Sequence, residues 1–586
     1  MFVANKKHHQ KALFSSVTML PEKQLKRLKE SWAGTFYEEV FCRIDEQPFA
    51  VLYSDKKSRP NVPVNVLVGL EILKDGNGWT DEEMYDQFSY SVQVRYALGL
   101  VSLDEGHFEL RTTYNFRKRL VQHMQETGEN LLEVCFEQIT DEQMTAYVVK
   151  GGVQRVDSKQ IASNIRQATR LQLLVEIMQR VYRMLDAADK LAFHDLCAPY
   201  IKNKSGQYIY RLKGEKHRPH IEQIGQVMAQ LLPALSTKYK TETGYRLLER
   251  VFGEHFKPVP PEEAAEKDKV VTAKTGKELS ADSLQSPDDW EATFRRKQGE
   301  DYVGYVTNVT ETVDSDGGLQ LITKIQTASN TTEDAALLND ALPELVERTG
   351  VDTVYNDGAY CSPDVDATCQ QLGVAQHPTA LRGDDPDPET PSLSNFTFEL
   401  DEVGHPQQMR CPHGHLVSVR PTRTNGRFVA CVDATTCTLC AAHDRRTRKN
   451  AALACLVLYF SLPQLAVALR RQRMLALRAS GGNPRSAVEA TMHEVTCRLE
   501  HGRLRVRGLC RVSMTMVASA AMANARRIWR FNRTQAQKTA HDSPSQLQSS
   551  IWSVFLSHLS TRYSLALFQL RLEHHRSLHF CWLQPC

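Results

Sequence analysis

The sequence predicts an α/β protein in which a mixed sheet flanked by helices follows a helical N-terminal domain. Three observations carry this prediction. Two short β-rich segments each carry an aspartate, Asp157 and Asp357. Between them lie two further β-rich segments, Tyr302–Thr312 and Leu319–Thr327, joined by a D-S-D-G-G turn. Long segments with apolar residues at helical spacing separate these strands, as is typical of a sheet covered by helices.

The composition excludes several classes of protein. A chain of 586 residues can bury a large core, and 41% hydrophobic with 24% charged residues is typical of a soluble globular protein. Its 14 cysteines lack the dense spacing of a small secreted domain, and Met1–Lys11 lacks the apolar core of a signal peptide. The apolar run Ala451–Leu469 is broken at Pro463, which predicts a buried helix that kinks or stops there rather than a membrane span. We therefore expect an intracellular protein with no membrane partner.

The charge is distributed unevenly along the chain. The total is only +3, but residues 411–532 contain 20 Lys/Arg against 5 Asp/Glu. A basic block of this kind suits a polyanionic partner such as DNA. The alternative is an arginine-rich surface that is merely solvated.

Residues 1–147 are predicted to form a helical domain. Asn65–Lys74 is an apolar-rich helix, and Thr80 with Glu83 three residues later is a capping-box pattern. Thr113 opens a further helix, Y-N-F-R-K-R-L, with a basic side. That side favours a DNA-binding domain, although a structural bundle with a solvated basic face gives the same pattern.

Residues 148–532 are predicted to form the domain that contains the sheet. A first strand spans 148–162, and a helical insertion of about residues 168–300 follows, with a loop or linker over Lys257–Asp289. After the hairpin come, in order, a helix over Asp334–Thr349, a strand over Val351–Asn356, a helix from Pro363 and a strand over Gly373–Thr379. A second insertion, about residues 382–480, bears Cys and His residues, and the tail 533–586 has no assigned role.

Without the insertions this order is that of an RNase H-like core, whose mixed sheet places the first and fourth strands side by side. Asp157 and Asp357 then lie adjacent, and a helix carrying Glu489 packs beside them. Three carboxylates can hold two hard divalent cations for attack on phosphorus. Glu494 and Glu500 are competing third acids, and aspartates at strand ends are also common as structural caps.

Several stretches together resemble bacterial insertion-sequence transposases of the DDE class with an InsH-type N-terminal domain. They are P-V-N-V-L-V-G-L-E-I-L, T-T-Y-N-F-R-K-R-L, V-D-S-K, V-Y-N-D-G-A-Y-C-S-P, R-S-A-V-E-A-T, R-V-R-G-L and A-M-A-N-A-R-R-I-W. The resemblance covers about residues 15–532. The chain departs from it where relatives carry a basic residue two helical turns beyond the glutamate. Val495 and Thr496 stand there, and Arg498 is the nearest basic residue.

The resemblance implies an enzyme that cleaves DNA at transposon ends and joins them to a target by transesterification. Asp157, Asp357 and Glu489 would be both the catalytic residues and the ligands of two Mg²⁺ or Mn²⁺ ions. The implied partner is double-stranded DNA, both inverted-repeat ends and target, bound by a homodimer in the bacterial cytoplasm at the nucleoid. A DDE nuclease without strand transfer and an inactive DNA-binding relative remain as alternatives.

Five basic residues are candidates for DNA contact: Lys159, Arg485, Arg498, Arg505 and Arg507. Lys159 lies two residues after Asp157, on the same face of a strand. Arg485 lies four residues before Glu489, where it could orient that glutamate, contact a phosphate or form an ordinary surface pair.

A zinc site is a separate hypothesis for the second insertion. The segment reads C-P-H-G-H from Cys411, then Cys431, then C-T-L-C at Cys437 and Cys440. These four thiolates could hold a structural Zn²⁺ tetrahedrally. The irregular spacing equally fits reduced cysteines without a metal.

Overall fold

The structure is a computed structural model. It describes residues 1–538 apart from 7–14, 55, 57–58, 167, 211, 213–216, 260–269, 298, 315–316, 382, 384–391, 402, 413, 424–425, 434–447, 451–454, 482–483 and 497–502. The chain divides into two compact units, Met1–Ala525 and Arg526–Cys586. All features described below belong to the first unit.

The N-terminal residues form a helical bundle. Its helices are α1 (Glu22–Lys29), α2 (Trp32–Glu39), α3 (Val64–Asn77), α4 (Asp81–Tyr90), α5 (Val92–Ala97), α6 (Leu110–Thr127) and α7 (Leu131–Ala146), with 3-10 turns at Phe41–Arg43 and Gln47–Leu52. Helix α3 is buried almost all round, which explains its nearly continuous apolar sequence. The capping box of Thr80 and Glu83 is confirmed at the start of α4, and α6 begins three residues before Thr113.

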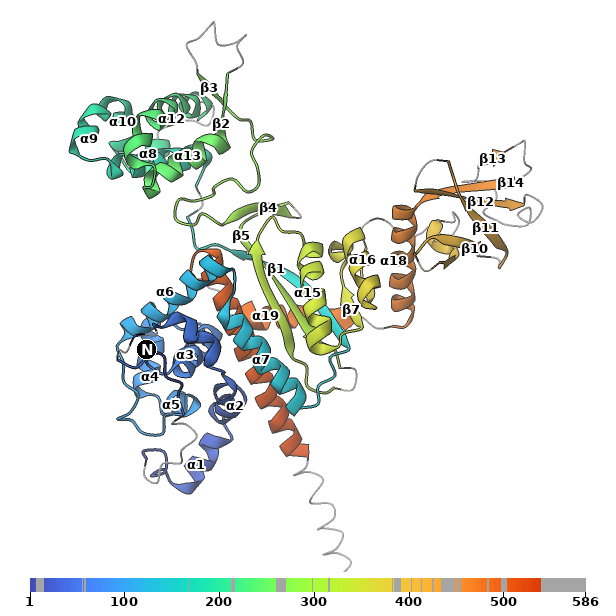
Figure 1. Cartoon of the computed structure of the whole chain (residues 1–586), viewed down its shortest axis with the longest axis horizontal. Coiled ribbons are helices and arrows are strands. Elements are labelled where there is room, and N and C mark those ends of the chain that lie inside the picture. The colour runs from blue at the N-terminus through green and yellow to red at the C-terminus, as the bar shows by residue number, and fades with distance from the viewer. Residues whose placement is uncertain are drawn as a thin grey trace, which may run out of the picture. The chain divides into compact units, whose positions relative to one another are not determined.

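The central sheet is mixed and has six strands (Figure 1). They are β1 (Val153–Ala162), β4 (Thr293–Lys297), β5 (Glu300–Thr312), β6 (Ile322–Ser329), β7 (Thr353–Asn356) and β8 (Ala375–Pro378). The order is β4-β5-β1-β7-β8, with β6 also paired to β5; β1 runs antiparallel to β5 and parallel to β7, and β7 runs parallel to β8. The predicted adjacency of the two aspartate-bearing strands is confirmed. Strand β4 was not predicted.

Helices cover both faces of this sheet. On one face α15 (Asp334–Thr349) and α16 (Pro363–Leu372) pack on Val156 and Val354. On the other face a helix that begins at residue 509 packs with α7 against β5 and β6. Each buried side chain of this kind contributes roughly 1.5–3 kcal/mol, so the two layers together hold the sheet rigidly.

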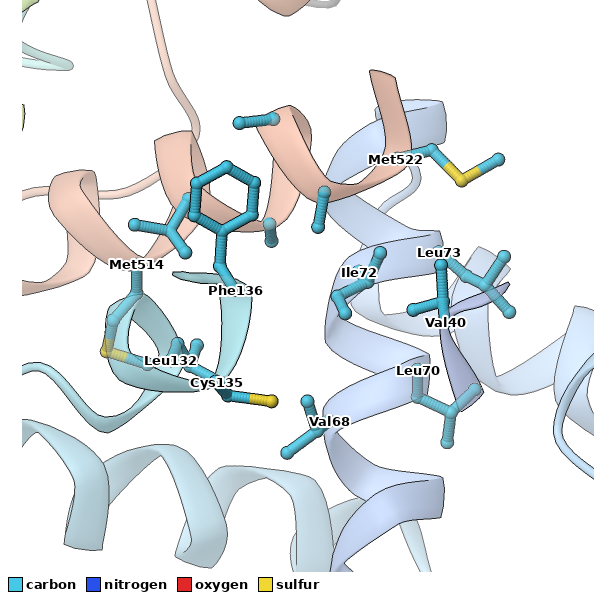
Figure 2. Packing of buried hydrophobic residues seen from close by; sticks show 14 of the residues in the cluster. Val40, Val68, Leu70, Ile72, Leu73, Leu132, Cys135, Phe136, Met514 and Met522 are labelled. Carbon is cyan, nitrogen blue, oxygen red and sulfur yellow. The ribbon is translucent and has the colours of Figure 1, made fainter. Parts of the chain in front are cut away.

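The N-terminal helices share one hydrophobic core with the sheet and the helix that begins at residue 509. Figure 2 shows Met514 beside Leu132 of α7, and Met522 beside α3. The approach at α3 is so close that a Cβ at Gly76 would lie 2.3 Å from Met522 Cβ. Asn524, from the A-M-A-N-A-R-R-I-W stretch, is buried and its side chain bonds both the N–H and the carbonyl of Ile322. The bundle is therefore packed as part of the sheet domain.

The first insertion has a hydrophobic core of its own. Its elements are α8 (Arg170–Met184), α9 (Ala187–Ala192), α10 (His194–Ile201), α11 (Ser205–Tyr210), α12 (His217–Tyr239), α13 (Thr243–His255), β2 (Phe256–Pro258) and β3 (Val271–Ala273). The stretch Lys257–Asp289, predicted to be a loop or linker, contains most of the two-stranded β2–β3 sheet in its first part.

The second insertion contains a second six-stranded sheet, in the order β13-β14-β12-β11-β10-β9. The strands are β9 (Thr397–Leu400), β10 (Pro406–Arg410), β11 (Leu416–Pro421), β12 (Arg427–Asp433), β13 (Arg448–Asn450) and β14 (Cys455–Ser461). Helix α18 (Leu462–Ala479) follows β14 and packs against β8 and β14.

The prediction of a buried helix that kinks or stops before Pro463 is wrong for Cys455–Ser461, and residues 451–454 lie outside the described residues. Cys455–Ser461 is a strand that pairs with β12 along its whole length, and its Leu-Val-Leu-Tyr-Phe sequence suits a half-buried strand. Pro463 stands in the first turn of α18, where a missing N–H costs no helical hydrogen bond. Ser461 caps that helix. Within the described ranges, no helix is long and apolar enough to span a bilayer.

Candidate active site at the end of strand β7

Asp157 and Asp357 meet where strand β7 ends. The parallel pairing of β1 with β7 stops at Arg155 opposite Tyr355, so Asp157 and Asp357 lie just beyond it. Asp157 itself is not at a strand end, because β1 continues to Ala162 along its other neighbour, β5. Asp357 therefore follows the last residue of β7 and lies next to Asp157, which is still within β1.

Both carboxylates are oriented by the backbone. Asp157 Oδ1 accepts the N–H of Ser158 at 2.9 Å. Asp357 Oδ1 accepts the N–H of Ala359 at 2.9 Å and thereby caps a 3-10 turn over Gly358–Tyr360. Each aspartate thus keeps its second oxygen, Oδ2, for another partner.

Arg485 is that partner for both aspartates. Its Nη2 lies 2.8 Å from Asp157 Oδ2 and 3.6 Å from Asp357 Oδ2. The side chains of Arg485 and Asp157 are 17% and 13% exposed, so this contact is shielded from water. Burial raises the pKa of Asp157, Arg485 opposes that rise, and the neighbouring Asp357 adds to it. The Arg485 guanidinium therefore offsets the repulsion between the two carboxylates.

The segment carrying Arg485 and Glu489 is fixed to the sheet by a buried network. It consists of a 3-10 turn, Pro484–Ala487, and helix α19 (Val488–Thr496). Arg155 pairs with buried Glu311 at 2.6 Å and also donates to the carbonyl of Pro484 at 2.9 Å. Glu311 in turn accepts the hydroxyl of Thr491 on α19 at 2.6 Å. These residues, whose role the sequence did not indicate, tie the turn and α19 to β1 and β5.

Glu489 lies in the first turn of α19, is exposed, and follows the fully buried Val488. The described residues contain no group of three His, Cys, Asp or Glu side chains placed to hold a metal ion. Of the alternative acids, Glu494 is half-buried on the same helix, and Glu500 lies outside the described residues. The geometry therefore brings the two aspartates together around Arg485, while Glu489 is exposed in the first turn of α19.

Tyr360 lies beside the aspartate pair. It is fully buried, and its hydroxyl donates to Asn308 Oδ1 at 2.7 Å. Burial raises the pKa of Tyr360 well above its ordinary value, and the carboxylates of Asp334, Asp157 and Asp357 add to the effect. The phenol stays neutral and supports the turn that Asp357 caps.

The basic candidates occupy different environments. Lys159 is exposed and its Nζ donates to Thr496 Oγ1 of α19 at 2.8 Å. Arg505 donates to the carbonyl of Gly78 at 3.4 Å, and Arg507 donates to that of Asn164 at 2.5 Å. Both arginine side chains remain about half exposed, at 50% and 45%. Arg498 lies outside the described residues.

A cavity of about 250 Å³ lies between the N-terminal helices and the segment around Arg505. On its wall Arg117 pairs with Glu71 at 2.8 Å and with Asp81 at 2.6 Å. Burial raises the pKa of Glu71 even though Arg117 opposes it. Because Arg117, Glu71 and Asp81 pair with one another, these charged residues on the cavity wall have a structural role.

The zinc hypothesis stays a prediction. Cys411 is half-buried and Cys431 exposed, and both are free thiols. Cys437 and Cys440 lie outside the described residues.

Comparison with known proteins gives one match. Residues 25–119, from α1 to the middle of α6, match the family model described as "Transposase domain (DUF772)". The matched stretch includes Glu71, Asp81 and Arg117, so this ion-pair network belongs to the recognised domain. No curated protein and no solved structure matches the chain.

Proposed function

We propose that this chain is a DNA transposase that binds insertion-sequence ends, cleaves them and joins them to target DNA. The observation that carries the proposal is the convergence of Asp157 and Asp357 at the end of β7, in a chain whose N-terminal residues match a transposase domain. The sheet order supports an RNase H-like core, because the two strands that lead to Asp157 and Asp357, β1 and β7, are adjacent and parallel.

The residues fit a divalent cation. Asp157 Oδ2 and Asp357 Oδ2 both face one guanidinium, so the site already holds positive charge between two hard oxygen donors. Asp157 and Asp357 would bind Mg²⁺ or Mn²⁺, with Glu489 as the third ligand from α19. The ions would supply an activated water or 3′-hydroxyl and stabilise the leaving oxygen.

The chain's own residues prepare this site. The N–H groups of Ser158 and Ala359 fix one oxygen of each aspartate and so aim the other. Arg485 neutralises the pair, and guanidinium groups also bind phosphates bidentately. We propose that Arg485 releases the two aspartates and binds a DNA phosphate when divalent cations neutralise the carboxylates in its place. The buried Arg155–Glu311–Thr491 network keeps Arg485 and Glu489 within reach of β1.

The exposure of Glu489 and the Arg485 bridge favour a second candidate, a DNA-binding relative without catalytic activity. A DDE nuclease without strand transfer is the third. One experiment separates all three. The full chain is incubated with Mg²⁺ or Mn²⁺, a plasmid, and either intact or pre-cleaved duplexes that carry the ends of the element. Joining of pre-cleaved ends to plasmid supports the transposase, cutting alone a nuclease, and binding alone the inactive relative.

A further inference from the structure

The sheet of the second insertion has one packed face, and most of the described side chains on its other face are exposed, although Val457 there is buried. On the packed face lie Met409, Val419, Phe428, Ala430, Val432 and Phe460, with Leu465 of α18. Successive residues of a strand point to opposite faces. The residues between these apolar positions therefore point to the other side of the sheet.

Those intervening residues carry arginines and a tyrosine. Arg420 on β11 pairs with Val429 on β12, which pairs with Tyr459 on β14. Arg427 on β12 and Arg410 on β10 lie on the same side. All three arginines are exposed, and Tyr459 is 57% exposed. We call Arg410, Arg420, Arg427 and Tyr459 the outer arginine face.

Among the side chains that the structure describes, little compensates the charge of this face. Within the described part of the chain, no hydrogen bond or ion pair engages the side chain of Arg420 or Arg427, and Arg410 donates to the carbonyl of Gly414. Of the two acids on these strands, Glu399 lies on β9 beyond β10, and the side chain of Asp433 on β12 lies outside the described residues. Such a face complements a polyanion.

We propose that the outer arginine face binds the phosphate backbone of duplex DNA without reading its sequence. Exposed guanidinium and phenol groups are suited to phosphate oxygens. The four strands β10, β11, β12 and β14 span about 14 Å at the usual strand spacing. That width exceeds a major groove of about 12 Å, so the face meets the backbone rather than the base edges. The proposal rests on the proposed function, because it assigns part of the DNA affinity of the transposase to the second insertion.

The test compares two double variants of the full chain that remove the same charge. Arg420→Gln with Arg427→Gln neutralises the outer arginine face. Arg183→Gln with Lys204→Gln neutralises two exposed cations of the first insertion. Binding to end-bearing, random and single-stranded DNA is measured by fluorescence anisotropy over a range of KCl, and thermal unfolding checks the fold.

Each phosphate contact contributes a slope of about 0.9 to the dependence of log affinity on log salt. We expect the Arg420/Arg427 variant to lose about 1.8 of that slope on both duplexes, and several-fold in affinity, while the control variant matches the wild type. If the wild type binds DNA and the Arg420/Arg427 variant shows the same salt slope as the wild type, this proposal is overturned and the proposed function still stands. A loss confined to single-stranded DNA, or to the end-bearing duplex, also overturns it. Failure of the wild type to bind any DNA overturns the proposed function itself.

Discussion

Arginines are used differently at the end of the central sheet and on the sheet of the second insertion. Arg155, Arg470 and Arg485 are each turned toward carboxylates: Arg155 toward Glu311, Arg470 toward Asp366, and Arg485 toward the aspartate pair. Arg420 and Arg427 lie on the outer arginine face. Arg420, Arg427, Arg470 and Arg485 all come from the basic block of residues 411–532, yet the last two pair with carboxylates and the first two are exposed on a sheet face. Local charge in a sequence therefore does not show which arginines bind DNA.

Removing a paired arginine should have the largest effect on stability. Arg155→Ala leaves Glu311 buried without its cation, and an uncompensated buried charge costs about 3–5 kcal/mol. We expect a marked fall in the unfolding temperature and in the denaturant midpoint of the sheet domain. The double variant Arg155→Met with Glu311→Leu should recover much of the loss. A single variant as stable as the wild type would show that this pair does not anchor α19.

Arg485→Ala tests whether the aspartate pair depends on its cation. Because Arg485 opposes the rise in the pKa of Asp157, its removal should raise that pKa further. A carboxyl with a raised pKa binds its proton more tightly in the folded state, so its contribution to stability falls as pH rises through that range. The variant should therefore lose stability, relative to the wild type, between acidic and neutral pH.

The same variant has a second readout. Mn²⁺ should raise its unfolding temperature more than it raises that of the wild type, because no guanidinium competes for the carboxylates. Arg478→Ala, at an exposed position of α18, is the matched control. Identical Mn²⁺ shifts in wild type and Arg485→Ala would contradict the exchange proposed for Arg485.

A smaller effect is expected for Arg505 and Arg507, which belong to the paired class by their contacts with Gly78 and Asn164. Each also forms a long ion pair of 4.0 Å, Arg505 with Glu83 and Arg507 with Asp288, and exposed ion pairs contribute about 0.2–1 kcal/mol each. Arg505→Gln with Arg507→Gln should lower stability slightly and change the salt dependence of DNA binding less than the Arg420/Arg427 variant does. If the Arg505/Arg507 variant lost more slope than the Arg420/Arg427 variant, these two arginines would contact DNA and the comparison between the two regions would fail.

The sequence predicts the central sheet well because its strands and helices have clear local patterns. Tyr302–Thr312 and Asp334–Thr349 lie almost as predicted, and topology alone brings Asp157 next to Asp357. The bridging role of Arg485 could not be predicted, since it depends on a contact across more than 300 residues. A spacing of four residues suggested only that Arg485 and Glu489 share a helix face.

The second insertion was harder to predict for a different reason. Cys455–Ser461 is an apolar run that fits a buried helix as well as a strand, and only its pairing with β12 decides between them. Alternation along β11 and β12 was the available signal for the outer arginine face. The core that α3 shares with the helix carrying Met522 could not be predicted either, because these two helices are far apart in the sequence.

The central claim is that Asp157 and Asp357 form the catalytic pair, and cleavage by their amide variants tests it most directly. Asp157→Asn and Asp357→Asn keep the size of each side chain and remove its charge. Asp364→Asn, at an exposed position of α16, is the matched control. Cleavage of end-bearing duplex is measured with Mg²⁺ or Mn²⁺, and DNA binding is measured on the same samples. We expect each catalytic variant to lose activity by on the order of 10³-fold or more, with binding and the control unchanged. Cleavage at the wild-type rate by either Asp157→Asn or Asp357→Asn would contradict the account.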